Sequence, residues 1–460
     1  MGSYDTIVIG GGPGGYVAAI KASQLGQKTA VVEKVHLGGI CLNWGCIPTK
    51  SLIRNAEIAH ILQHDAKTFG FSFDNLKLDY SVAQKRSRQV SERLVKGIGF
   101  LMKKNKIDVI EGTAKLKSAT EVQVGDEVHS AKHIIIATGA RARLIPGLEI
   151  NGKTLLTYHQ ALEQTEVPKS MVVIGAGAIG MEFSYVFSSY GAEVTVVELL
   201  PRVLPLEDEE ISAEMEKQFK RAKIKTLTNT KVEKIDDHGD SVTVTVSKDG
   251  KQSEIKAQMA LISIGVRPNT EDLGLDAVGV KLDQRGFIEI GDKMETNVPG
   301  IYAIGDVTGK LALAHVASAQ GIIAAEAIAG HETRPLKYVN MPRCTYTHPE
   351  VASVGLTEAQ AKEQGYAVKT GKFAFQVNGK ALGLNETAGF VKIVAEEKYN
   401  EVLGVHMIGP GVTEMLAGPT GMIGLEATLD ELAGTVHPHP TLSEVVMEAA
   451  HVALGEPIHI

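Results

Sequence analysis

The chain has 460 residues, of which 44% are hydrophobic and 22% charged, and its net charge is −7. This length exceeds what one hydrophobic core organises and predicts about three domains. The composition is typical of a globular protein, and the mild acidity without a polybasic run argues against binding to nucleic acid or to a membrane. Three cysteines are too few for a secreted fold held together by disulfides.

No secretory signal or transit-peptide pattern precedes the first apolar run, so we expect the protein in the cytoplasm. The most apolar stretch, residues 170–187, contains Gly175, Gly177 and Gly180. These glycines predict a strand, a turn and a helix rather than a segment that spans a membrane.

The chain opens with a strand, a glycine-rich turn and a helix. Residues 4–9 form a short apolar run, a glycine cluster follows at 10–15, residues 16–25 predict a helix, and residues 29–32 predict a second strand that closes on Glu33. A GxGxxG sequence between a strand and a helix, with an acid at the end of the next strand, is typical of a dinucleotide site.

Cys41 and Cys46 follow directly after this unit. In a regular helix their Cα atoms would be about 8.7 Å apart, whereas a disulfide requires less than about 7 Å. A bond between them would therefore need an irregular segment, which the neighbouring glycines allow. Their position beside a nucleotide site favours redox chemistry, and the alternatives are two small buried hydrophobic residues or a metal site, which lacks further thiols. We interpret Cys344 as structural.

The middle of the chain repeats the opening pattern. Residues 50–105 are predicted to be mostly helical, with a charged, solvated face at 85–93. Three further strands are predicted at 133–137, 260–264 and 300–304, and each ends near a glycine. A second strand at 171–174 leads into Gly175, Gly177 and Gly180, a helix at 181–190 and a strand at 193–197 that closes on Glu198. Gly10 to Glu33 and Gly175 to Glu198 both span 23 positions. A plain glycine-rich turn explains one copy but not two at equal spacing.

The two acids indicate which nucleotides bind. A carboxylate at Glu33 or Glu198 would accept hydrogen bonds from a ribose 2′-OH and would repel a 2′-phosphate. The second site is therefore predicted to prefer NAD to NADP, although Arg202, four residues later, is the kind of residue that a 2′-phosphate attracts.

The last part of the chain, from about residue 338, predicts an α+β domain. Strands are expected at 390–394 and 402–408, and helices at 418–428 and 442–454. His437 and His439 each precede a proline, which keeps them on extended backbone. Thr441 and Glu444 have the spacing of a capping box, so Glu444 either caps the helix or orients a histidine.

Together these residues resemble the pyridine nucleotide–disulfide oxidoreductase family over essentially the whole chain. Residues 39–50 are similar to the redox loop of that family, and Thr138-Gly139 and Gly305-Asp306 are similar to its strand ends around FAD. The resemblance implies an α/β fold with two Rossmann-like dinucleotide-binding domains and a C-terminal α+β dimerisation domain. The implied domains are an FAD-binding domain with the redox disulfide (1–148), an NAD-binding domain (149–270), a return to the FAD-binding domain (271–337) and the interface domain (338–460).

The resemblance also assigns roles to single residues. It implies that Cys41 and Cys46 form the cycling disulfide, that His439 is the general acid/base oriented by Glu444, and that Lys50 lies near the flavin and pairs with Glu182. An acid at Glu182 would also suit the start of a helix. The implied FAD-site residues are Gly10, Gly12, Gly14, Gly15, Glu33, Lys50, Gly112, Thr138, Gly139, Asp306, Ala312, Leu313, Ala314 and His315. The implied NAD-site residues are Gly175, Gly177, Ile179, Gly180, Glu198, Val232 and Gly265.

Within the family the chain is most similar to the members that oxidise protein-bound dihydrolipoyl groups to lipoyl, with FAD bound and NAD as acceptor. Those members form homodimers and serve the lipoyl-bearing acyltransferase of 2-oxo acid dehydrogenase complexes or the carrier protein of glycine cleavage. One alternative is a reductase of another disulfide such as glutathione, against which the apolar Leu442 and the expected NAD preference argue. A non-catalytic flavoprotein subunit is a second alternative, but a scaffold needs no set like Cys41, Cys46 and His439.

Overall fold

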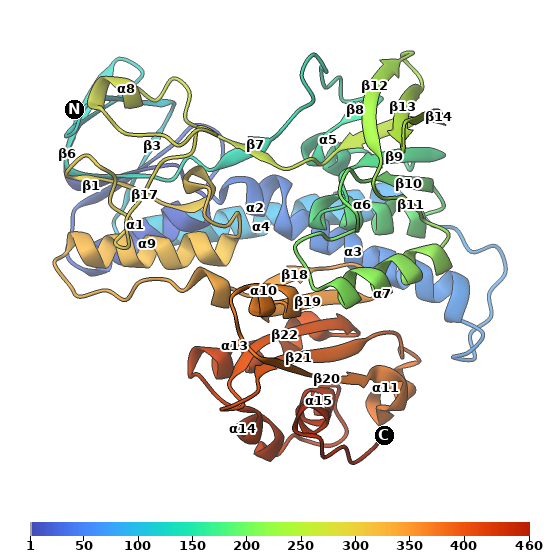
Figure 1. The fold of residues 1–460 in the computed structure, drawn as a ribbon. Helices are drawn as coiled ribbons and strands as arrows, with labels where there is room; N and C mark the ends of the chain where they lie inside the picture. The colour runs from blue at the N-terminus through green and yellow to red at the C-terminus, as the bar shows by residue number, and fades with distance from the viewer. Residues whose placement is uncertain (1) are drawn as a thin grey trace. The chain divides into compact units, whose positions relative to one another are not determined.

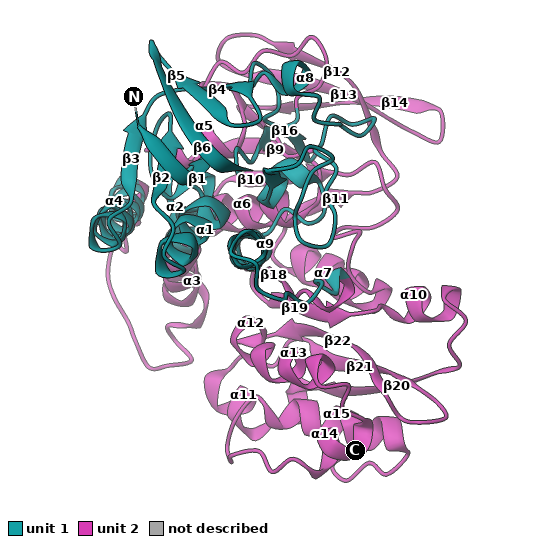
Figure 2. Cartoon of the chain, turned by 90° about the vertical axis from the view of Figure 1, so that its left-hand side faces the viewer, with its two compact units in different colours: residues 1–51, 81–143, 265–338 teal, residues 52–80, 144–264, 339–460 magenta. Residues whose placement is uncertain are grey.

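The repeated strand–glycine–helix pattern forms two sheets, one mainly and one wholly parallel, in a computed structural model that describes residues 2–460. One sheet lies in each of the two units into which the chain divides. Unit 1 comprises residues 1–51, 81–143 and 265–338, and unit 2 comprises residues 52–80, 144–264 and 339–460 (Figure 2). The predicted boundaries of the three domains, in four segments of the chain, stay a prediction.

The sheet of unit 1 is built around β1 (Ser3–Ile9), which pairs in parallel with β2 (Thr29–Glu33) and β6 (Glu127–Ile136) (Figure 1). Ile7 and Ile9 enter the apolar cluster on one face of this sheet, and Val8 enters the cluster on the other. Burial on both faces explains why the strand is a continuous apolar run. The strand order is β3-β2-β1-β6-β5-β4, with β17 also paired to β6. The further elements are β3 (Asp108–Glu111), β4 (Ala114–Ser118), β5 (Glu121–Val124), β7 (Ala140–Ala142), β16 (Val266–Pro268), β17 (Ile301–Ala303), α2 (Gly39–Trp44), α4 (Tyr80–Lys104), α8 (Leu275–Val278) and η2 (Gly305–Thr308).

Helix α1 (Pro13–Gln24) packs closely against α9 (Ala314–Ile328). A Cβ atom on Gly321 would lie 2.6 Å from the Gly14 carbonyl oxygen, so the contact requires a glycine there. Helix α1 begins before the predicted residue 16, because Pro13 is suited to the first helical turn, where its missing N–H costs nothing.

The first sheet of unit 2 repeats the arrangement of unit 1. Strand β9 (Ser170–Ile174) lies between β10 (Glu193–Val197) and β15 (Met259–Ile262), and helix α6 (Ala178–Ser189) follows β9 as α1 follows β1. The order is β11-β10-β9-β15-β8, and all of its pairs are parallel. Further elements are β8 (Leu155–Leu156), β11 (Lys225–Leu227), an antiparallel sheet of β12 (Lys231–Asp237), β13 (Val242–Lys248) and β14 (Lys251–Ala257), and helices α3 (Cys46–His60), η1 (Ile61–Asp65), α5 (Tyr158–Glu163) and α7 (Glu209–Arg221). Helix α3 starts in the residues of unit 1 and continues into those of unit 2.

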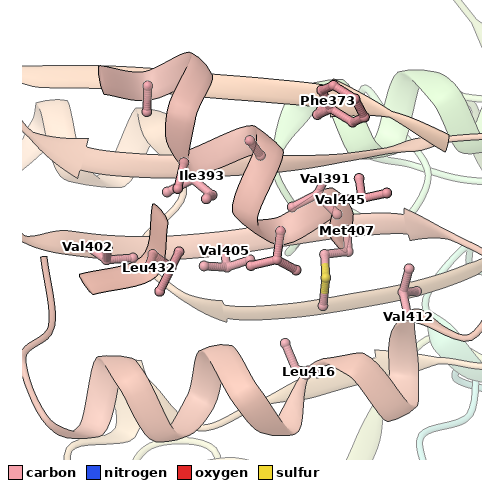
Figure 3. Close-up of a cluster of buried hydrophobic side chains, with 14 of the residues drawn as sticks. Phe373, Val391, Ile393, Val402, Val405, Met407, Val412, Leu416, Leu432 and Val445 are labelled. Carbon is pink, nitrogen blue, oxygen red and sulfur yellow. The ribbon is translucent and has the colours of Figure 1, made fainter. Parts of the chain in front are cut away.

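The C-terminal part of unit 2 is an antiparallel sheet with helices. Its strand order is β18-β19-β22-β21-β20, and Phe373, Val391, Met407 and Val445 are among the buried side chains of its core (Figure 3). The elements are β18 (Arg343–Thr345), β19 (Glu350–Gly355), β20 (Val368–Ala374), β21 (Phe390–Glu396), β22 (Val402–Gly409), η3 (Tyr338–Asn340), η4 (Phe375–Val377), α10 (Glu358–Glu363), α11 (Gly379–Leu384), α12 (Val412–Met415), α13 (Ala417–Gly424), α14 (Leu429–Gly434) and α15 (Glu444–Leu454).

Three predicted helices differ from the structure. The helix expected at 418–428 is α13, which ends at Gly424 before the positive φ of Glu426, and Thr428 forms a capping box that starts a separate helix, α14, outside the expected range. Helix α15 begins at Glu444 rather than at residue 442. The helical segment expected at 50–105 is interrupted between residues 66 and 79. Among residues 2–460, no helix combines the length and apolarity that a membrane crossing requires.

Candidate active site

The first glycine loop leaves space beside the start of α1. A Cβ atom on Gly15 would lie 1.9 Å from the Gly10 carbonyl oxygen, so Gly15 lets the helix pack on the strand end. A Cβ atom on Gly12 would meet only Gly39 Cα, at 3.9 Å, and no side chain caps the helix at Gly12. The N-terminus of α1 therefore fits a phosphate group.

The second loop repeats this geometry. A Cβ atom on Gly180 would lie 2.1 Å from the Gly175 carbonyl oxygen, whereas one on Gly177 would have no atom within 4 Å. No side chain caps α6 at Gly177. Ile179, on the first turn of α6, is partly exposed.

Backbone N–H groups hold the two strand-end acids in the same way. Glu33 Oε2 accepts from Gly11 at 2.7 Å, and Glu198 Oε2 accepts from Ala176 at 2.7 Å. The other oxygens accept from Val35 and Leu200. Because a carboxylate oxygen accepts more than one hydrogen bond, both acids retain capacity for a ribose hydroxyl.

Cys41 and Cys46 form a disulfide with Cα atoms 4.7 Å apart. Helix α2 ends at Trp44, Gly45 adopts a non-helical conformation, and α3 begins at Cys46. The prediction that a bonded pair requires a break in the helix is confirmed.

The redox segment lies directly against the first glycine loop. The Gly38 N–H donates to the Gly11 carbonyl oxygen at 2.7 Å, and a Cβ atom on Gly39 would lie 2.7 Å from Gly12 Cα. The disulfide and the first dinucleotide loop thus belong to one local structure in unit 1.

Two residues that support this segment were missed at the sequence level. Asn43 Nδ2 donates to the carbonyl oxygens of Leu37 and Gly39, at 3.1 and 2.9 Å, and Arg88 donates to the Asn43 carbonyl oxygen. The interpretation of residues 85–93 as a solvated face is wrong for Arg88, because its guanidinium reaches the redox loop. Nothing in the charge pattern distinguishes Arg88 from its neighbours.

The remaining candidate FAD residues also lie in unit 1. Gly112 N–H donates to the Glu33 carbonyl oxygen, Thr138 exchanges hydrogen bonds with Asn269 beside Gly139, and Lys50 lies on α3. The stretch Ala312, Leu313, Ala314 and His315 enters α9, with Leu313 at its N-cap.

Asp306 lies partly buried in η2, and desolvation raises its pKa to about 6. Buried Gln320 accepts from the adjacent Gly305 N–H at 2.6 Å. Gln320 was missed because its contact is with a backbone group 15 residues away.

The remaining candidate NAD residues are dispersed. Val232 lies on β12, and Gly265, with a φ of 104°, follows β15. Glu182 on α6 is buried, and its Oε1 accepts from the Tyr346 N–H at 3.0 Å. The pairing of Lys50 with Glu182 stays a prediction.

Glu444 makes both contacts that the sequence suggested. Its Oε1 lies 2.8 Å from His439 Nδ1, and its Oε2 accepts from the Thr441 N–H at 2.8 Å. Desolvation would raise the pKa of Glu444, but these two hydrogen bonds outweigh it and hold the pKa below its usual range. An ionised carboxylate only accepts, so His439 Nδ1 carries the proton and Nε2 is left to act as a base. His437 instead bonds the Thr435 carbonyl oxygen through Nδ1.

Two further features lie away from these residues. A cavity of about 230 Å³ in unit 2 has Tyr185, His348 and Glu350 among its lining residues, and the lining includes no predicted site residue. Within residues 2–460, no group of three or more His, Cys, Asp or Glu side chains has an arrangement suited to a metal ion. Cys344 is half-buried on β18.

Comparison with known families agrees with this geometry. The model of the pyridine nucleotide-disulphide oxidoreductase family matches residues 4–321, and that of the family's dimerisation domain matches residues 341–450. The chain belongs to the pyridine nucleotide-disulphide oxidoreductase family.

Individual relatives show which members of this family the chain is similar to. The chain is 52% identical to a dihydrolipoyl dehydrogenase of Mycobacterium leprae, with 100% of both chains covered, and 44% identical to that of Bacillus subtilis, with 99% of both covered. It superposes on a crystal structure of LpdA from Mycobacterium tuberculosis with a TM-score of 0.89 and 29% identity, covering 97% of this chain and 99% of that one.

Proposed function

We propose that the chain oxidises protein-bound dihydrolipoyl groups to lipoyl through the Cys41–Cys46 disulfide and passes the electrons by way of FAD to NAD. The observation that carries this proposal is the redox segment seated on the first glycine loop, with Gly38 bonded to Gly11. Full-length similarity to dihydrolipoyl dehydrogenases supports the choice of substrate.

The chemistry begins with a proton transfer. His439, oriented by Glu444, takes the proton of one substrate thiol at Nε2. The thiolate attacks Cys41 Sγ, the Cys41–Cys46 bond breaks, and Cys46 leaves as a thiolate. His439 releases the first proton to solvent and takes the proton of the second substrate thiol, whose sulfur attacks the substrate sulfur of the mixed disulfide, which closes the lipoyl ring and releases Cys41 as a thiolate.

Two electrons have then moved from the substrate to the cysteine pair, and two protons have left the substrate. When bound, FAD supplies the two-electron acceptor that restores the disulfide, and NAD supplies the final hydride acceptor. The chain itself holds FAD at the loop of Gly10, Gly12 and Gly15 and NAD at the loop of Gly175, Gly177 and Gly180.

The preference for NAD over NADP has support in the second loop. Glu198 is fixed by two backbone N–H groups where a 2′-phosphate would meet its charge. Arg202 Nη1 lies 2.6 Å from Glu209 Oε1, so its charge is already partnered. This ion pair weakens the argument that Arg202 serves a 2′-phosphate.

The expected partners follow from the family. Its dimerisation-domain model matches residues 341–450, which supports a homodimer. We assign the lipoyl group to a separate protein, either the acyltransferase of a 2-oxo acid dehydrogenase complex or the carrier of glycine cleavage. The cytoplasm is the compartment that we propose, since only one disulfide forms among three cysteines and it is the redox pair.

The test is an anaerobic reaction of the oxidised holoenzyme with one equivalent of dihydrolipoamide, followed by NAD. We expect a long-wavelength thiolate–flavin absorbance and then NADH. Failure of dihydrolipoamide to reduce the enzyme, combined with rapid reduction by NADH, would retain the cofactors and exclude this substrate.

A further inference from the structure

A buried ammonium group ties the start of helix α7 to the C-terminal sheet of unit 2. Lys392 on β21 is 2% exposed, and its Nζ lies 3.0 Å from Asp208, 2.8 Å from Glu210 and 2.7 Å from Glu358. Burial alone would lower the pKa of Lys392, but the three carboxylates outweigh it and raise the pKa above its usual range. Lys392 therefore stays charged, and its contacts are fixed.

A second cation, Arg343, pairs with Glu207, the residue just before Asp208. Arg343 Nε on β18 lies 3.2 Å from Glu207 Oε1, and both side chains are largely buried. Glu207, Asp208 and Glu210 are thus bound by three cations from the same antiparallel sheet, since Lys372 on β20 also pairs with Glu210. Solvent screens the Lys392–Asp208 and Arg343–Glu207 pairs little, because their side chains are largely buried, whereas Glu210 is partly exposed.

Glu207 and Asp208 lie at the end of a segment that begins after Glu198, the acid predicted to bind the ribose. Residues 199–208 connect Glu198 to α7, and at the middle of this segment the Leu204 N–H donates to the Ala176 carbonyl oxygen at 2.8 Å. Ala176 in turn donates its N–H to Glu198. The second glycine loop, Glu198 and the Lys392 cluster are therefore linked by consecutive short contacts.

We propose that Lys392 is a positioning residue for NAD, an inference that rests on the proposed function. By fixing Asp208 and Glu210, next to the Glu207 that Arg343 fixes, it holds residues 199–208 so that Glu198 and the Ala176 carbonyl keep the geometry of the nucleotide site. Residues that fix a binding group from outside the site set its precision. Lys392 acts on nucleotide affinity and leaves the thiol chemistry of Cys41 and Cys46 untouched.

The experiment compares the two half-reactions in the holoenzyme. In Lys392→Met we expect the KM for NAD to rise by about threefold to thirtyfold. The rate at which dihydrolipoamide reduces the flavin before NAD is added should stay within about twofold of wild type. Glu210→Gln removes the charge that pairs with Lys392 and with the exposed Lys372, but Lys392 keeps Asp208 and Glu358, so the variant should fold and show a smaller rise in the same KM. Lys392→Arg, which keeps the charge, should restore most of the affinity.

Lys362→Met is the matched control, since Lys362 pairs with the same Glu358 at the surface and touches no residue of α7 through that pair. It should leave the KM for NAD unchanged. A lower melting temperature in Lys392→Met and Glu210→Gln, with an unaltered KM for NAD in both, would overturn the inference and leave a purely structural cluster. If wild type does not oxidise dihydrolipoamide, the proposed function fails, and the dissociation constant of NADH still tests the role of Lys392.

Discussion

Asp306 combines an ionisable carboxyl group with an environment that opposes its ionisation. Its pKa is raised from 3.8 to about 6 by desolvation, so the folded protein binds the proton more tightly than the unfolded chain does. As the pH rises from about 4 to about 6, ionisation therefore destabilises the apoprotein, by at most about 3 kcal/mol. A ligand hydroxyl that donates to the carboxylate would offset part of this cost.

We expect Asp306→Asn to affect stability and cofactor binding in opposite directions. The apoprotein should become more stable by about 1–3 kcal/mol near pH 8 and change little near pH 4, because the substitution removes only the cost of ionisation. FAD should bind more weakly, since a neutral amide is a poorer acceptor. Urea unfolding of apoprotein at the two pH values, with FAD titration, measures both. Equal stabilisation at both pH values would show that ionisation is not the cause.

Glu444 offers a second test at the same scale, because its two oxygens serve different partners. Glu444→Gln keeps the shape, but its amide nitrogen cannot accept, so either His439 or the Thr441 N–H loses its acceptor. We expect kcat for dihydrolipoamide oxidation to fall on the order of 10²-fold. Reduction of an artificial acceptor by NADH, which needs no thiol deprotonation, should stay within about twofold. An equal fall in both activities would assign Glu444 to folding alone.

The residues of the candidate site differ in how well they could be predicted from the sequence. Cys41 and Cys46 stand out because two thiols five positions apart follow a glycine loop, and the spacing alone requires the helix break found at Gly45. Arg88 and Gln320 have no such signal. Each reaches a backbone group far away in sequence, and that approach exists only once helices and strands have packed.

At the scale of elements, each glycine loop contains one glycine that allows the helix to pack on the strand and another that leaves room for a ligand. Gly15 and Gly180 lie where a side chain would meet backbone oxygen, Gly177 lies where it would meet open space, and Gly12 lies where it would only touch Gly39 Cα without overlap. The helix ends were predicted less well. Pro13 and the capping box of Thr428 are visible locally, but the break between α13 and α14 depends on the positive φ of Glu426, a conformation that its side chain does not favour.

This separation predicts different outcomes for two alanine substitutions in one loop. Gly177→Ala should fold with a melting temperature close to that of wild type and lose NAD affinity by about tenfold or more, since the methyl group occupies the space that the pyrophosphate approaches. Gly180→Ala should destabilise by about 1–3 kcal/mol, because the methyl group overlaps the Gly175 carbonyl. Thermal unfolding of both variants measures their stability, and NADH titration measures their affinity for the nucleotide. Similar losses of stability would refute the distinction.

At the scale of the whole molecule, the sequence predicted the repeated αβ architecture and the change to an α+β fold near residue 338, because both depend on local patterns. It gave no sign that residues 52–80 group with unit 2 instead of with the redox segment before them. It also gave no sign of the Lys392 cluster, whose four charged residues come from α7, α10 and β21 or their edges. Such a cluster forms only through contacts between distant segments.

The same cluster sets how unfolding depends on pH. Desolvation would raise the pKa values of Asp208 and Glu210, but nearby cations outweigh it, and hydrogen bonds from Lys362 and Lys392 lower that of Glu358. Carboxylates with a lowered folded pKa contribute stability that is present above about pH 4 and is lost as the pH falls through their folded pKa values. The raised pKa of Lys392 contributes stability below about pH 10.4 that is lost as the pH rises through the folded value.

Lys392→Met should therefore destabilise unit 2 in a pH-dependent way. Near pH 7 the substitution leaves three carboxylates without their buried cation, and we expect a loss of about 3 kcal/mol. Near pH 3 the carboxylates of the variant take up protons and need no countercharge, so the loss should shrink to about 1 kcal/mol or less. Urea unfolding midpoints of wild type and variant between these pH values measure the difference. A loss that is the same at both ends would mean that Lys392 stabilises the protein through the packing of its methylene groups, because packing does not titrate.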